Sequence, residues 1–122
     1  MRDARAEQLS NLVISAFFAV YNGLTPGYLE QVYTGAMCVE LRHRRIPFER
    51  ERPIDVRYRG EIVGQYRADI IVEDVLIVEV KAGCSLHESA RWQTLNYLRA
   101  TGMTIGLILH FGAKPSFQRV VA

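Results

Sequence analysis

The most constraining feature of the sequence is an apolar, β-branched run from Val75 to Lys81 that carries two charged residues, Glu79 and Lys81. Such a composition is typical of a strand in the core of a sheet. Glu79 and Lys81 are two residues apart, so they project from the same face of that strand. A buried carboxylate or ammonium is costly unless it is paired or bound to a metal. The run therefore predicts a core strand with a polar patch on one face.

The rest of the chain alternates between helical and strand periodicity. Apolar residues recur at helical spacing from Leu9 to Val20, and Thr25 followed by Pro26 is a good helix start. The pattern Ser85-Leu86-His87-Glu88 is a capping box, and Gly102 is a helix stop. We expect helices at about 9–22, 25–43 and 85–101, and strands at about 54–58, 62–72, 75–81, 104–111 and 117–121.

This order of elements predicts an α/β fold with a mixed β-sheet flanked by helices. The first three strands should form an antiparallel meander, and the helix at 86–101 lets the next strand return parallel to an earlier one. The length of 122 residues fits one domain covering 1–122. The apolar runs are shorter than the ~20 residues of a membrane span. No signal-peptide core follows Met1, so we expect a cytoplasmic protein without a membrane partner.

Asp69, in the preceding predicted strand, reaches the Glu79 face in only one of two registers. A two-residue turn, Glu73-Asp74, would place Asp69 opposite Val78 and on the wrong face. A three-residue turn, Glu73 to Val75, or a bulge would place it opposite Glu79. We expect the second arrangement, because it gathers two carboxylates and one ammonium in a single patch.

Such a patch suits the hydrolysis of phosphodiesters. Asp69, Glu79 and the Val80 carbonyl offer hard oxygen ligands to Mg²⁺ or Mn²⁺, which would polarise the phosphate and activate a water. Lys81 would orient that water and stabilise the transition state. The alternative is a buried ion pair between Lys81 and one of the two acids.

Two further pairs of residues accompany this patch. Glu30 and Tyr33 are three apart on the second helix, where Glu30 would add a third carboxylate; alternatively it is an exposed glutamate favoured by the helix dipole. Gln93 and Tyr97 are four apart on the third helix. They would reach the scissile phosphate or the metal waters, or else form the polar edge of an amphipathic helix.

The charge distribution and the cysteines bear on two further kinds of site, a phosphate-binding surface and a cysteine-bound metal centre. The formal net charge is only +2, but eight arginines fall between Arg42 and Arg67. They form either a basic face for phosphate oxygens or a set of ion-paired strands. Cys38 and Cys84 lack the spacing of a zinc or iron–sulfur site, so we interpret them as reduced thiols.

Taken in order, the motifs resemble the GxxExxY proteins, which are grouped with the PD-(D/E)XK nuclease superfamily. The resemblance runs from about Leu9 to Arg119 and implies a restriction-endonuclease-like core, helix, three strands, helix, strand (α-βββ-α-β). The motifs that carry it are Gly27-x-x-Glu30-x-x-Tyr33, Ala68-Asp69-Ile70-Ile71-Val72, Val78-Glu79-Val80-Lys81-Ala82, Gln93-x-x-x-Tyr97-Leu98 and Gly106 to Gly112.

The resemblance also implies roles for individual residues. Asp69 and Glu79 would be metal ligands, Lys81 the catalytic lysine and Glu30 the acidic residue of the leading helix. The pair Gln93 and Tyr97 is similar to the Gln-x-x-x-Tyr motif of RecB-like nucleases. One departure is His110, where family members often have Asn; it puts a secondary contact in doubt.

The expected function is a Mg²⁺- or Mn²⁺-dependent nuclease acting on DNA, with RNA as the second choice. A domain of this size has little surface for reading sequence, so specificity would need a homodimer or a protein partner. Phe17, Phe18 and Tyr28 would suit such an interface, or else the core. The alternative is a catalytically silent module that keeps the fold and binds protein or nucleic acid. Loss of a metal ligand or of the lysine would favour it, and the sequence shows neither.

Overall fold

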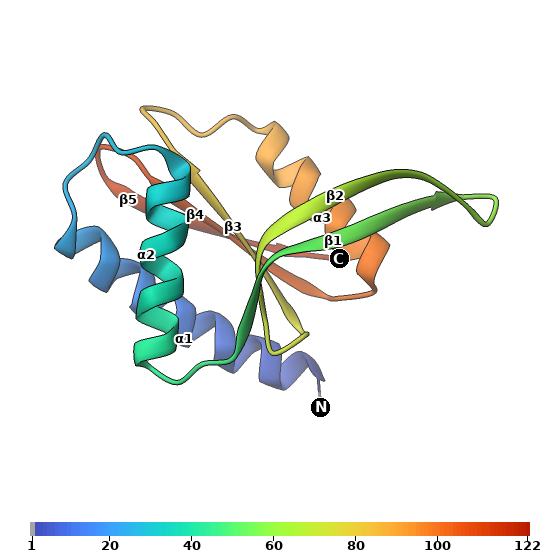
Figure 1. The fold of residues 1–122 in the computed structure, drawn as a ribbon, viewed down its shortest axis with the longest axis horizontal. Helices are drawn as coiled ribbons and strands as arrows, with labels where there is room; N and C mark the ends of the chain where they lie inside the picture. Colours follow the sequence, from blue (N-terminus) through green and yellow to red (C-terminus); the bar gives the residue numbers. More distant parts are fainter. Residues whose placement is uncertain (1) are drawn as a thin grey trace.

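A five-stranded mixed sheet in the order β1-β2-β3-β4-β5 forms the centre of the computed structural model, which describes residues 2–122 (Figure 1). The helices and strands follow one another in the order that the sequence periodicity predicts. In chain order they are α1 Arg2–Gly23, α2 Glu30–His43, β1 Phe48–Tyr58, β2 Glu61–Val72, β3 Leu76–Ala82, α3 Ser89–Thr101, β4 Ile105–Phe111 and β5 Pro115–Val121.

The strand connections confirm the expected topology. β1, β2 and β3 form an antiparallel meander, and α3 then crosses over so that β4 lies parallel to β3. β5 returns antiparallel to β4 and forms one edge of the sheet. The element order α2, β1 to β3, α3, β4 is the expected α-βββ-α-β core.

The helices cover the two faces of the sheet and create two hydrophobic cores. The larger core lies between α1, α2 and the sheet, and Leu76, Val78 and Val80 of β3 point into it. The smaller core lies under α3 and receives Ile77. Glu79 shares the α3-covered face with Ile77, because alternate residues of a strand point to the same side. No helix in residues 2–122 is long and apolar enough to cross a membrane.

The β1–β2 hairpin extends past the helices (Figure 1). Its ladder is interrupted beside Asp69. The pairing skips Glu51, which has a φ of 57° and lies opposite Asp69. β1 begins at Phe48, six residues before the expected start, since the charged run after Phe48 has no apolar alternation. Its pairing with the apolar end of β2 makes it a strand.

Two predicted helix starts were wrong. α2 begins at Glu30 rather than Thr25, because Gly27 has a φ of 105°, which a right-handed helix does not allow. α3 begins at Ser89 rather than Ser85. There the imidazole Nδ1 of His87 accepts a hydrogen bond from the Ser89 amide at 3.0 Å, so the predicted capping box does not form.

Candidate active site

β2 and β3 separate at Asp69 and Glu79, where side chains replace the missing ladder bonds. The regular pairing ends at Ile70 opposite Val78, and one further step in the same register places Asp69 opposite Glu79. There the Asp69 amide donates to Glu79 Oε2 at 3.1 Å, and the Val80 amide donates to Asp69 Oδ2 at 2.8 Å. The two acidic residues are therefore directly linked across the opening between the strands.

The turn between these strands produces that register. β2 ends at Val72 and β3 begins at Leu76, so the turn has three residues. Glu73 and Asp74 adopt φ values of 48° and 61° within it. The prediction of a three-residue turn is confirmed. A turn one residue shorter would move Asp69 to the other face.

Glu79 is the more deeply buried member of the acidic pair, with 2% of its surface exposed. Two causes raise the pKa of Glu79 to about 9: burial is the larger, and the negative charge of Asp69 is the second. Near neutral pH the Glu79 carboxyl therefore holds a proton when no cation is bound. A buried acid with this shift is the kind of group that gathers at functional sites.

Lys81 continues the same face of β3 and contacts α3. Its Nζ donates a hydrogen bond to Gln93 Oε1 at 3.1 Å. Within residues 2–122 we find no ion pair between Lys81 and an acid, so the ion-pair alternative is not formed. A neutral amide thus holds the ammonium, and the positive charge of Lys81 partly offsets the rise in the pKa of Glu79.

Tyr97 lies one helical turn after Gln93 and is covered by β2. It is 4% exposed, and its ring centroid lies 5.6 Å from that of Tyr66. Burial and the charge of Glu79 raise the pKa of Tyr97 to about 12, so its hydroxyl stays neutral and able to donate a hydrogen bond.

The segment before α2 is held in a non-helical shape by Tyr33. The Tyr33 hydroxyl donates to the Thr25 carbonyl at 2.7 Å and accepts from the Tyr28 amide at 3.2 Å. Gly27 supplies the positive φ that this loop requires. Together these residues place Glu30 at the first position of α2. The spacing Gly-x-x-Glu-x-x-Tyr is therefore explained by this loop: the Gly allows its positive φ, the Tyr holds it, and the Glu begins the helix that follows.

Glu30 lies beside Lys81 but is not grouped with the acidic pair. A cavity of about 180 Å³ is lined by Glu30, Lys81 and Gln93 among others. Among residues 2–122, however, no three His, Cys, Asp or Glu side chains come together as a metal cluster. Glu30 therefore lies at the rim of the site, with Asp69 and Glu79 as a separate pair.

The donor atoms at the strand opening fit a hard divalent cation. Asp69 and Glu79 provide carboxylate oxygens. The Val80 amide points toward β2, and in an extended strand the carbonyl of the same residue points the same way. These oxygens come from adjacent positions on two neighbouring strands, and oxygen donors are the ligands that Mg²⁺ and Mn²⁺ prefer.

His110 connects the end of β3 to β5, a role that sequence reasoning missed. Its Nε2 lies 2.9 Å from the Gly83 carbonyl, and its Nδ1 lies 3.3 Å from Ser116 Oγ. Because a carbonyl only accepts, Nε2 carries a proton and donates to Gly83. His110 thus supports the segment after Lys81.

The arginine-rich stretch between Arg42 and Arg67 is partly neutralised by nearby acids. Three of its arginines form the pairs Arg44–Glu40, Arg52–Asp74 and Arg57–Asp55. The ion pairs form within α2 and its C-cap, within β1, and between β1 and the turn after β2, which are not the expected cross-strand pairs.

Comparison with known proteins agrees with this geometry. A family model described as "PD-(D/E)XK nuclease superfamily" matches residues 7–120. No curated protein matches the chain. A solved structure described as "Crystal structure of SSO0001" superposes with a TM-score of 0.56 over 75% of this chain, at 14% sequence identity. This chain spans 48% of the length of that one, and the likeness is one of fold.

The superposition supports the expected restriction-endonuclease-like fold, a mixed sheet flanked by helices. The family match includes the α2 motif, the strand opening at Asp69 and Glu79, and the α3 residues that hold Lys81. The chain belongs to the PD-(D/E)XK nuclease superfamily.

Proposed function

We propose that the protein is a divalent-metal-dependent nuclease that hydrolyses phosphodiester bonds in DNA, with RNA as the second choice of substrate. One observation carries the proposal: Asp69 and Glu79 are linked across the strand opening, and Lys81 follows on the same face with its ammonium bonded to the neutral amide of Gln93. Membership of a nuclease superfamily supports it. The loop geometry around Gly27 and Tyr33 supports a place in the GxxExxY group.

In this proposal Asp69, Glu79 and the Val80 carbonyl would hold Mg²⁺ or Mn²⁺, with Glu30 as a further acid at the rim. A bound divalent cation would supply the positive charge that polarises the phosphate and acidifies a water. Glu79 would give up its proton when it becomes a ligand, because its raised pKa reflects burial and the negative charge of Asp69, which the charge of Lys81 offsets only in part.

Lys81 would act on the substrate directly. Its ammonium has further protons to donate beyond the hydrogen bond to Gln93. One of them would reach a phosphate oxygen or the attacking water, and the positive charge would stabilise the negative charge that grows in the transition state. Gln93 would position Lys81, and the neutral Tyr97 hydroxyl would donate a hydrogen bond beside it.

The test is a cleavage assay on linear, circular and single-stranded DNA and on RNA, with Mg²⁺ or Mn²⁺. We expect cleavage by the wild type that EDTA abolishes and that Lys81→Ala and Asp69→Ala remove. Lys114→Ala is the matched control, because Lys114 is exposed in the turn between β4 and β5. Failure of the wild type on every substrate would favour the alternative, a catalytically silent binding module.

A further inference from the structure

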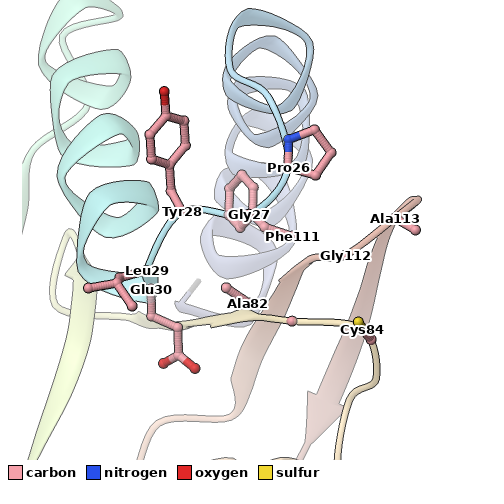
Figure 2. Close-up of a pocket in the computed structure, with 11 residues that line it drawn as sticks. Pro26, Gly27, Tyr28, Leu29, Glu30, Ala82, Cys84, Phe111, Gly112 and Ala113 are labelled. Carbon is pink, nitrogen blue, oxygen red and sulfur yellow. The ribbon is translucent and has the colours of Figure 1, made fainter.

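A second, larger cavity lies next to the candidate active site. Its volume is about 650 Å³, within the range of roughly 300–1,000 Å³ typical of pockets for small organic ligands. Three chain segments line it, residues 26–30 before and at the start of α2, residues 82–84 at the end of β3, and residues 111–113 after β4 (Figure 2).

The lining of this cavity favours a neutral, flat ligand over a phosphate. The described residues that line it include no Lys, Arg or His, and Glu30 is the one acid among them. Phosphate recognition depends on cationic side chains or on helix N-termini free of nearby acids. The exposed apolar side chains of Pro26, Tyr28 and Leu29 are instead suited to an aromatic ring.

Hydrogen bonds and ring stacking hold the cavity in a fixed shape. The ring of Phe111 stacks on Tyr33 with centroids 4.3 Å apart. The Gly83 amide donates to the Phe111 carbonyl at 3.4 Å, and the Tyr21 hydroxyl donates to the Gly112 carbonyl at 2.7 Å. A ligand would therefore enter without first ordering these segments, which lowers the entropy cost of binding.

The cavity adjoins the smaller one that contains Lys81. Glu30 and Ala82 line both. In Figure 2 the Glu30 side chain extends from the start of α2 toward the strand that carries Ala82. A nucleic acid strand with one phosphate at Lys81 would therefore have the base of a flanking nucleotide at the larger cavity.

We propose, on the basis of the proposed nuclease function, that this cavity receives an unpaired nucleobase next to the scissile phosphate. The preferred substrate class is then single-stranded DNA, including unpaired ends of duplexes. A base within a duplex is stacked and paired, and it enters a pocket only after extrusion from the helix. A base in a single strand binds apolar and aromatic surfaces without that cost.

Selective alkylation of Cys84 tests this proposal on the folded protein. Cys84 is exposed and lines the cavity, whereas Cys38 is buried. Treatment with N-ethylmaleimide should therefore add a group at the cavity. Cys84→Ser treated with the same reagent is the matched control, because it retains the cavity without the added group.

Binding is measured in EDTA, so that no cleavage occurs, with a fluorescent single-stranded oligonucleotide and an abasic strand of equal length and charge. We expect the untreated wild type to bind the strand with bases about tenfold more tightly than the abasic strand. Alkylated wild type should lose most of this difference, and treated Cys84→Ser should keep it. The untreated wild type should also bind single strands more tightly than blunt duplex.

The outcomes separate the two proposals. An equal preference for bases in alkylated and untreated wild type would overturn the nucleobase cavity, even if the protein cleaves DNA with a metal ion. A preference for bases that alkylation removes, in a protein that cleaves nothing, would support the cavity and overturn the nuclease function.

Discussion

The backbone amide of Asp69 donates a hydrogen bond to the carboxylate of Glu79, the residue opposite it on the neighbouring strand, at 3.1 Å. This bond stands where a regular ladder would have an amide-to-carbonyl bond. It links two acidic side chains across an opening in the sheet, and one of them, Glu79, is almost wholly buried. The predictions below follow from this pair and from the residues that position it.

In the metal-free protein, Glu79→Gln should flatten the dependence of stability on pH. The pKa of Glu79 is raised from 4.5 to about 9, so the unfolded chain releases this proton at a lower pH than the folded chain does. The wild type should lose stability as pH rises from about 5 to about 8, on the order of a few kcal/mol, and level off above the folded pKa. Glutamine cannot ionise and should lose much less.

Urea unfolding in EDTA at a series of pH values measures this difference. Glu61→Gln is a suitable control, because Glu61 is exposed at the start of β2. Parallel pH profiles for the wild type and Glu79→Gln would contradict the prediction.

Asp69→Asn should weaken the binding of Mn²⁺ by at least about tenfold, since it removes one charged oxygen donor. Asp55→Asn, in the β1–β2 hairpin, should leave the affinity unchanged.

Calorimetric titrations in two buffers of different ionisation enthalpy should also show that the wild type releases a proton on binding, because Glu79 is protonated beforehand. Equal heats in the two buffers would contradict the release of a proton from Glu79 on metal binding.

Lys81→Ala should lower kcat by roughly 10²- to 10⁴-fold, as expected for loss of a group that transfers or orients a proton. Gln93→Ala removes the hydrogen-bond partner of Lys81 and should cost less, about tenfold, through loss of orientation. Both variants should bind Mn²⁺ like the wild type, because neither side chain is a proposed ligand. Single-turnover cleavage and the metal titration together separate these effects, and a matching loss of metal affinity would argue against the assigned roles.

Tyr33→Phe should destabilise the protein by about 1–2 kcal/mol, because it removes two hydrogen bonds and keeps the ring. The Thr25 carbonyl and the Tyr28 amide would lose their shared partner. Hydrogen exchange should therefore increase in the loop before α2, with little change in β3. Tyr58→Phe, on the exposed hairpin, serves as control, and unchanged exchange in the loop would show that the hydroxyl does not hold it.

Gly106→Ala should destabilise the fold by about 1–3 kcal/mol through overpacking. A Cβ at Gly106 would lie 2.6 Å from Thr94 Cγ2 on α3 and 3.6 Å from the Ile77 carbonyl. Gly64→Ala is the matched control in another strand, since a Cβ there meets nothing within 4 Å. Comparison of the two unfolding midpoints tests whether α3 packs against β4 as closely as the structure indicates.

Elements with strong local signals were predictable from the sequence. The helix stop at Gly102 is confirmed, with a φ of 75° in the left-handed region. The apolar run that became β4 is buried along its whole length, as expected of a strand covered on both sides. Periodicity reports which face of an element is buried, so it predicts such elements well.

Signals of one or two residues failed where a contact outside the signal decides the conformation. Thr25 and Pro26 are good helix starters, but the Tyr33 hydroxyl binds the Thr25 carbonyl and holds that segment as a loop. The first part of β1 has charged residues in place of an apolar alternation, and only its pairing with β2 makes it a strand. The first contact joins residues eight apart and no helix-start signal encodes it. The second depends on the pairing of two whole strands.

By itself, the sequence determined the order of helices and strands and the placement of Glu79 and Lys81 on one strand face, since a strand repeats every two residues. Only the tertiary structure decided that Asp69 joins Glu79, because two turn lengths were open and they place it on opposite faces. It also decided that Glu30 lies at the rim beside Lys81. Distances between side chains on different elements depend on packing of the whole chain, which local pattern does not encode.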